Sequence, residues 1–177
     1  MELETMVQAL ETPEAAAQLG RLYGNDPETI EKQMARYGAM IRQHRKLFGD
    51  RGNVFLVSAP GRTEIGGNHT DHNHGRVLAA AVNLDTLCAV TPRNDMTVQF
   101  HSHGYSPIEI RLDDLSVHDD EKGTTMALIR GVAAGMKEAG YRIGGFDAVV
   151  TSTVAGGSGL SSSAALEVML TDRKSVV

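Results

Sequence analysis

The stretch that most constrains this chain is a glycine loop followed at once by three serines. It reads Val-Ala-Gly-Gly-Ser-Gly-Leu-Ser-Ser-Ser-Ala-Ala-Leu over residues 154–166. The apolar run Phe146–Thr151 before it favours a strand, and we expect a helix to begin at Leu160 or Ser161. At such a junction the unpaired N–H groups and the positive dipole end of the helix point at one spot. The stretch therefore predicts an anion site that suits a nucleotide phosphate.

The residues of this expected phosphate site are small or carry hydroxyl groups. Because the loop has neither the Gly-Lys-Ser/Thr of a P-loop nor the glycine spacing of a dinucleotide-binding loop, its chemistry alone indicates only an anion. A structural turn capped by serines is the alternative interpretation. We assign phosphate binding to Gly156, Gly157, Ser158, Gly159, Leu160, Ser161 and Ser162. The hydroxyl groups of Ser162 and Ser163 are also candidate ligands for Mg²⁺, which prefers oxygen donors.

A second unusual stretch, residues 60–75, is polar and follows a short apolar strand expected at Val54–Ser58. It reads Pro-Gly-Arg-Thr-Glu-Ile-Gly-Gly-Asn-His-Thr-Asp-His-Asn-His-Gly. Several of its side chains could bind hydroxyl groups and handle a proton, namely Arg62, Glu64, His69, Asp71 and His72. The alternating histidines and aspartate could instead chelate zinc or copper, and a solvated loop is a third interpretation.

The remaining elements indicate an α+β fold. Thr12-Pro13-Glu14 and Asp26-Pro27-Glu28 each combine an N-cap, a proline and an acid, so we expect two helices in the first fifty residues. The apolar face from Ile30 to Phe48 is assigned to core packing, and Gly49 ends the helix. Further strands are expected at 77–82, 86–91, 96–100 and 108–111, and a helix at 124–138. Because strands come first and helices are added later, α+β suits the chain better than repeated βαβ units.

Charge and cysteine content exclude several classes of protein. The 177 residues carry 17 basic and 22 acidic side chains and a formal net charge of −5, which argues against a nucleic-acid partner. No apolar run approaches the roughly 18 residues of a membrane span, so we expect no membrane partner. The single cysteine, Cys88, rules out an internal disulfide, and we expect a cytoplasmic protein.

Both stretches resemble motifs of one enzyme family. Residues 157–166 resemble the phosphate-binding motif of the GHMP kinases, small-molecule kinases that use ATP, although Ala155 stands where that motif usually has proline. The polar stretch resembles the galactokinase signature of this family. The residues that match the signature are Gly61, Arg62, Gly67, His69, Thr70, Asp71 and Asn73. Two positions depart from it, because Asn68 replaces a glutamate and Glu64 an asparagine.

The resemblance implies a function and roles for these residues. It implies transfer of the γ-phosphate of ATP to the anomeric hydroxyl of galactose, with ATP and Mg²⁺ required and the enzyme expected to be a monomer. Arg62 would stabilise the transition state, while Asn68, His69 and Asp71 would bind the sugar. Asn68 leaves open a GHMP kinase for another sugar. A catalytically dead galactose sensor is a further alternative, although the segment Leu160–Leu166, where such sensors can carry deletions, is intact.

The resemblance also implies how the chain is divided. We expect a helical extension over residues 1–50 and an incomplete GHMP kinase N-terminal domain over 51–171, a mixed sheet with helices on one side that stops before the C-terminal domain. Residues 172–177, Asp-Arg-Lys-Ser-Val-Val, are expected to be a non-native tail. In the family the catalytic aspartate lies beyond Val168, so we expect this chain alone to be inactive.

Overall fold

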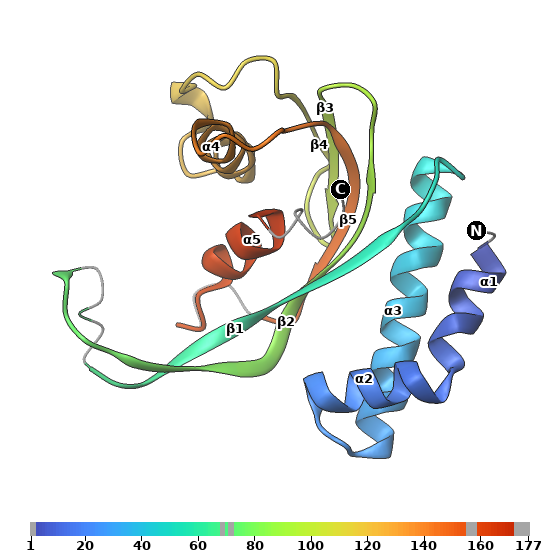
Figure 1. Cartoon of the computed structure of the whole chain (residues 1–177). Coiled ribbons are helices and arrows are strands. Elements are labelled where there is room, and N and C mark those ends of the chain that lie inside the picture. The colour runs from blue at the N-terminus through green and yellow to red at the C-terminus, as the bar shows by residue number, and fades with distance from the viewer. Residues whose placement is uncertain (1–2, 68–69, 71–72, 155–158, 172–177) are drawn as a thin grey trace.

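Five strands form one mixed sheet between two layers of helices (Figure 1). The computed structural model describes residues 3–67, 70, 73–154 and 159–171. The helices are α1 (Leu3–Gln8), α2 (Pro13–Tyr23), α3 (Pro27–Phe48), α4 (Thr125–Glu138) and α5 (Ser162–Thr171), with 3-10 turns at Ala9–Glu11 and Asp119–Glu121. The strands are β1 (Phe55–Gly66), β2 (Leu78–Pro92), β3 (Thr97–Ser102), β4 (Ile108–Arg111) and β5 (Phe146–Ser152).

The strand order β1-β2-β5-β3-β4 makes the sheet mixed. β2 pairs antiparallel with both β1 and β5, and β3 pairs antiparallel with β4, whereas β3 and β5 run parallel. Because β3 and β5 are parallel, the chain crosses over between them, and α4 lies in this connection. A helical crossover in an otherwise antiparallel sheet confirms the α+β fold class.

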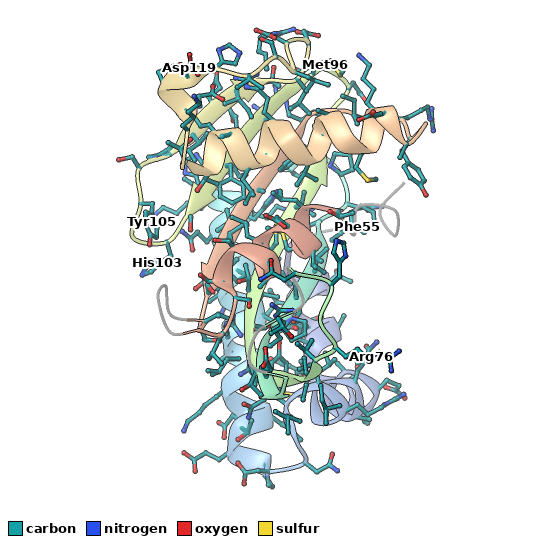
Figure 2. All side chains as sticks on the ribbon, turned by 90° about the vertical axis from the view of Figure 1, so that its left-hand side faces the viewer. Phe55, Arg76, Met96, His103, Tyr105 and Asp119 are labelled. Carbon is teal, nitrogen blue, oxygen red and sulfur yellow. The ribbon has the colours of Figure 1, made fainter. Side chains whose placement is uncertain are left out.

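One face of the sheet packs against α4 and α5. Alternate residues of the strands, such as Val57, Cys88 and Val150, lie in one core with Ile129 of α4 and Met169 of α5. Figure 2 views the molecule from this side and shows both helices lying in front of the sheet. Within residues 51–171, the helices α4 and α5 therefore lie on one side of a mixed sheet, as predicted.

The opposite face packs against the N-terminal helices. Leu87, Ala89 and Val149, the neighbours of the residues facing α4 and α5, form a second core with α2 and α3. The contributing helix residues include Tyr37 and Phe48, both nearly fully buried. The first fifty residues therefore form a second layer of the fold, on the right of the sheet in Figure 1. The domain boundary at residues 50 and 51 stays a prediction.

The N-terminal caps are where the sequence predicts them. The backbone N–H of Ala15 donates to Thr12 Oγ1 at 3.3 Å, and that of Thr29 donates to Asp26 Oδ2 at 2.9 Å. Gly49 ends α3 with a φ of 68°, in the left-handed region that glycine adopts without a Cβ clash. The prediction of two helices was incomplete, since α1 forms a short third helix before the Thr12 cap.

Three of the strands that the sequence predicts have other bounds in the structure. The runs 77–82 and 86–91 belong to one strand, β2, and β1 continues beyond Ser58 to Gly66. The pairing shifts from Pro60↔Asp85 to Arg62↔Ala81, so an irregularity is absorbed without ending either strand. Backbone pairing along these two strands does not require apolar side chains. The polar composition of residues 60–66 therefore gave no sign that β1 continues.

No helix among the residues described is long and apolar enough to cross a membrane.

Candidate active site

The polar stretch and the serine-rich helix start meet although they are 99 residues apart in sequence. The backbone N–H of Arg62, on β1, donates to the carbonyl oxygen of Leu160 at 3.1 Å. The Nε of the same arginine donates to Ser161 Oγ, also at 3.1 Å. The two stretches that the sequence singled out thus form one site, with the guanidinium group anchored at the start of α5.

A glycine makes this close approach possible. A Cβ placed on Gly61 would lie 3.0 Å from the carbonyl oxygen of Leu160 and 3.2 Å from Cγ2 of Val154. Both neighbours flank the glycine loop, and one of them is backbone that cannot move aside easily. Any larger residue at position 61 would therefore push β1 away from α5, and Arg62 with it.

The start of α5 has the geometry of an anion site. The helix begins at Ser162, one residue later than the range expected, and the carbonyl oxygen of Ser161 accepts a bond from the N–H of Ala165 at 3.0 Å. N–H groups in the first turn of a helix have no partner within the helix. Ser162 is half-buried and Ser163 exposed, so hydroxyl groups accompany these donors. Gly156, Gly157 and Ser158 lie outside the described residues, and the assignment of the whole set to phosphate binding stays a prediction.

Thr70 organises the described part of the loop between β1 and β2. Its hydroxyl donates to the carbonyl oxygen of Gly67 at 2.8 Å, and its own carbonyl oxygen accepts bonds from the N–H groups of Asn73 and Gly75. Gly67 has a φ of 122°, and a Cβ there would lie 2.7 Å from the carbonyl oxygen of Arg76. The loop is therefore closed by backbone contacts that only glycine permits at position 67.

The expected sugar-binding residues belong to the loop between β1 and β2, and their role stays a prediction. Asn68, His69 and Asp71 lie outside the described residues, as does His72. Glu64 lies on β1, opposite Ala79 of β2. Within the part of the chain that is described, no three histidine, cysteine or acidic side chains cluster as metal ligands.

Sequence reasoning missed the group that lies behind this site. Asp85 of β2 is 2% exposed and bonds through its backbone to Thr153, directly after β5. Neither residue belongs to a recognisable motif, and a lone aspartate in an apolar strand was the one available signal.

Burial raises the pKa of the Cys88 thiol to about 12, so this cysteine is not a nucleophile at neutral pH.

Comparisons with known proteins agree with this geometry. Residues 42–92 match the galactokinase galactose-binding signature. A galactokinase from Streptomyces coelicolor is 38% identical over 135 residues, which cover 75% of this chain and 34% of that protein. A galactokinase from Bacillus subtilis is 33% identical over 128 residues, which cover 70% of this chain and 32% of that protein. The chain spans about a third of the length of the curated relatives it matches.

A solved structure shares both the fold and the sequence pattern. The galactokinase of Lactococcus lactis, crystallised in complex with galactose, superposes with a TM-score of 0.67 at 32% identity. The match covers 73% of this chain and 34% of that one.

Proposed function

We propose that this chain, which belongs to the galactokinase family of GHMP kinases, supplies part of an enzyme that phosphorylates galactose at its anomeric hydroxyl with ATP. The observation that carries the proposal is the contact between Arg62 and Ser161. It unites a stretch whose residue types suit a sugar with a helix start that suits a phosphate, which is what transfer between the two requires.

Arg62 and the start of α5 have distinct roles in this proposal. The first-turn N–H groups of α5 hold phosphate oxygens of ATP, together with the loop before the helix. The guanidinium of Arg62 is held by Ser161 and its backbone by Leu160, and it stabilises the charge that develops on the transferred phosphoryl group. Asn68, His69 and Asp71 bind the sugar hydroxyls. The group that accepts the hydroxyl proton belongs to the part of the relatives' length that this chain does not span.

Mg²⁺ fits the donors at the start of α5. Hydroxyl oxygens are hard ligands that this ion accepts alongside phosphate oxygens, and Ser162 and Ser163 offer two. When bound, Mg²⁺ neutralises charge on the transferred phosphate. We further propose that the enzyme is a cytoplasmic monomer.

Steady-state kinetics of the full-length protein test this function. Asp71→Ala is expected to raise the KM for galactose strongly, because the loss of a charge-assisted pair of hydrogen bonds costs roughly 2–4 kcal/mol. The KM for ATP is expected to change little. Asp119→Ala is the matched control, since Asp119 is an exposed aspartate on a 3-10 turn. Unchanged galactose kinetics in Asp71→Ala would remove this residue from the site.

A panel of sugars tests the alternative that Asn68 raises. The amide accepts and donates hydrogen bonds but carries no charge, so it can favour a different pattern of hydroxyl or amino groups than glutamate does. We expect the highest kcat/KM with galactose. A higher kcat/KM with another sugar would identify a different kinase of the same family, and ATP-independent galactose binding without turnover would identify a sensor.

A further inference from the structure

A buried carboxylate ties the N-terminal helices to the sheet directly behind the candidate active site. Asp85 accepts bonds from Tyr23 Oη of α2 at 2.5 Å, from Arg36 Nη1 of α3 at 2.6 Å and from Ser58 Oγ of β1. The hydroxyl groups of Tyr23 and Tyr37 lie 2.9 Å apart. Donors from three elements therefore converge on one side chain.

The backbone of the same residue holds the entry to the glycine loop. The N–H of Asp85 donates to Thr153 Oγ1 at 2.9 Å, and its carbonyl oxygen accepts from the N–H of Thr153 at 2.9 Å. Thr153 precedes Val154, which is buried and lies against Gly61. Asp85 also pairs with Pro60, two residues before Arg62. Both strands that lead into the site are thus fixed at this point.

We propose that Asp85 is a positioning residue through which the N-terminal helices set the place of Thr153 and Val154, which lead to the phosphate site, and of Arg62. This inference rests on the proposed function and deepens it. If the Asp85 side chain no longer accepts hydrogen bonds from Tyr23 and Arg36, β2 can shift relative to β1. The shift would occur where the pairing is irregular, between Pro60↔Asp85 and Arg62↔Ala81. Thr153 would move with the Asp85 backbone, and the start of the loop with it.

Burying Asp85 with its polar partners costs more free energy than apolar packing at this place would. A carboxylate at 2% exposure gives up most of its hydration, and Arg36 Nη2 is buried with no hydrogen-bond partner among the described residues. Apolar residues in place of Asp85 and its polar partners together would extend the neighbouring core around Leu87 without this cost. A charged side chain here instead selects one arrangement of α2, α3 and β1 relative to β2, which suits a positioning role.

Asp147 provides a matched control. It is a buried aspartate of the same sheet, 0% exposed, and it pairs with Arg93 Nη1 at 2.8 Å and Arg51 Nη1 at 3.4 Å. Its backbone pairs with Thr91 and Gln99, at the other end of β5 from Thr153. Asp147→Asn and Asp85→Asn therefore both neutralise a buried, arginine-paired carboxylate, and only one of them lies behind the loop.

Two measurements on the full-length protein test the proposal. We expect Asp85→Asn to weaken binding of a non-hydrolysable ATP analogue with Mg²⁺ at least tenfold by calorimetry, and to raise the KM for ATP while the KM for galactose stays within twofold. Hydrogen exchange is expected to speed up at Thr153, Val154 and the first turn of α5. Asp147→Asn is expected to lower stability without either change. Tyr23→Phe, which removes one donor and keeps the ring, should move both readouts in the direction of Asp85→Asn by a smaller factor.

The outcomes separate this proposal from the proposed function. If hydrogen exchange is faster at 153–154 and at the start of α5 in Asp85→Asn but not in Asp147→Asn, the positioning role is upheld. If in addition neither the parent protein nor any variant binds ATP, the proposed function is wrong and the positioning role still stands. ATP-analogue affinity and exchange that are unchanged in both Asp85→Asn and Tyr23→Phe overturn the role of Asp85. Equal effects in Asp85→Asn and Asp147→Asn also overturn it, since they indicate general destabilisation. If Asp85→Asn does not fold, Tyr23→Phe alone decides.

Discussion

Ser161 combines backbone strain with a contact that the site needs. Its φ is 60°, in the left-handed region, where a residue with a Cβ is less stable than glycine by about 1 kcal/mol. The same residue accepts the hydrogen bond of Arg62 Nε. Strain of this kind persists only where the surroundings enforce it, and it is common where a side chain must be held in one place. The hydroxyl of Ser161 supplies an acceptor that glycine lacks.

Two substitutions separate these effects. Ser161→Ala keeps the strain and loses the hydroxyl, while Ser161→Gly loses both. We expect both variants to lower kcat in the full-length enzyme by a similar factor, on the order of ten, because Arg62 loses its anchor. We expect Ser161→Gly to be more stable than Ser161→Ala by roughly 1 kcal/mol in urea unfolding. Equal stability would show that the backbone is not strained, and unaltered kcat would remove Ser161 from the positioning of Arg62.

At this scale the sequence indicated candidate residues by their chemistry but not the contacts that those residues make. Arg62 and the serines were singled out because a guanidinium and a helix start have recognisable chemistry. The bond between Arg62 and Ser161 was not predicted, because a single sequence contains no information on which of many distant pairs meet. Asp85 was missed for the same reason, since its partners come from α2, α3 and β1.

The helices and strands show which local signals are reliable. Caps at Thr12 and Asp26 and the stop at Gly49 act within one turn, so the structure agrees with them. β1 was cut short because residues 60–66 lack an apolar run, and β2 was divided at residues 83–85, whereas the backbone pairing of the two strands continues to Gly66↔Leu78. Strand length along this ribbon depends on the partner strand, and no window of one sequence contains both.

The packing of α3 on β5 depends on a neutral histidine. His44 is fully buried, and its Nε2–H donates to the carbonyl oxygen of Asp147 at 3.1 Å. Nδ1 is buried without a hydrogen-bond partner among the described residues. Burial lowers the pKa of His44, and the charge of Arg45 acts in the same direction. Protonation would therefore place a charge in the apolar layer between α3 and the sheet.

This lowered pKa predicts a pH dependence of stability. Below pH 6.5 the unfolded chain binds a proton at position 44 that the folded chain does not, so the free energy of unfolding falls as the pH drops. Above pH 6.5 the contribution is complete. We expect urea unfolding between pH 5 and 7 to show this slope, at most about 1.4 kcal/mol per pH unit for one proton. His44→Leu should flatten it, whereas His103→Asn, at the exposed histidine labelled in Figure 2, should not. A slope that survives in His44→Leu would assign the dependence to another group.

The whole molecule is a sheet that needs cover on both faces. Leu87, Ala89 and Val149 are at most 1% exposed, and what covers them is the layer formed by α2 and α3. The sequence predicted the helices of this layer and assigned the apolar face from Ile30 to Phe48 to core packing. Their place on the far side of the sheet from α4 and α5 could not be predicted, because an apolar helix face does not specify which surface it covers.

Removing this layer is therefore expected to unfold the chain. A variant that starts at Asp50 loses the side chains of Tyr37, Met40, Ile41 and Phe48, all nearly fully buried. Deleting one such side chain costs about 2–5 kcal/mol, so the loss of four costs roughly 8–20 kcal/mol, as much as the roughly 5–15 kcal/mol of net stability that a domain has. We expect this variant to bind the dye ANS and to lose its cooperative urea transition. A variant that lacks residues 1–11 removes only α1 and its 3-10 turn, whose Met6 and Leu10 are partly buried, and should stay cooperative with a lower midpoint. A cooperative transition at an unchanged midpoint in the chain from Asp50 would show that residues 1–49 are dispensable and that the sheet is stable with one face uncovered.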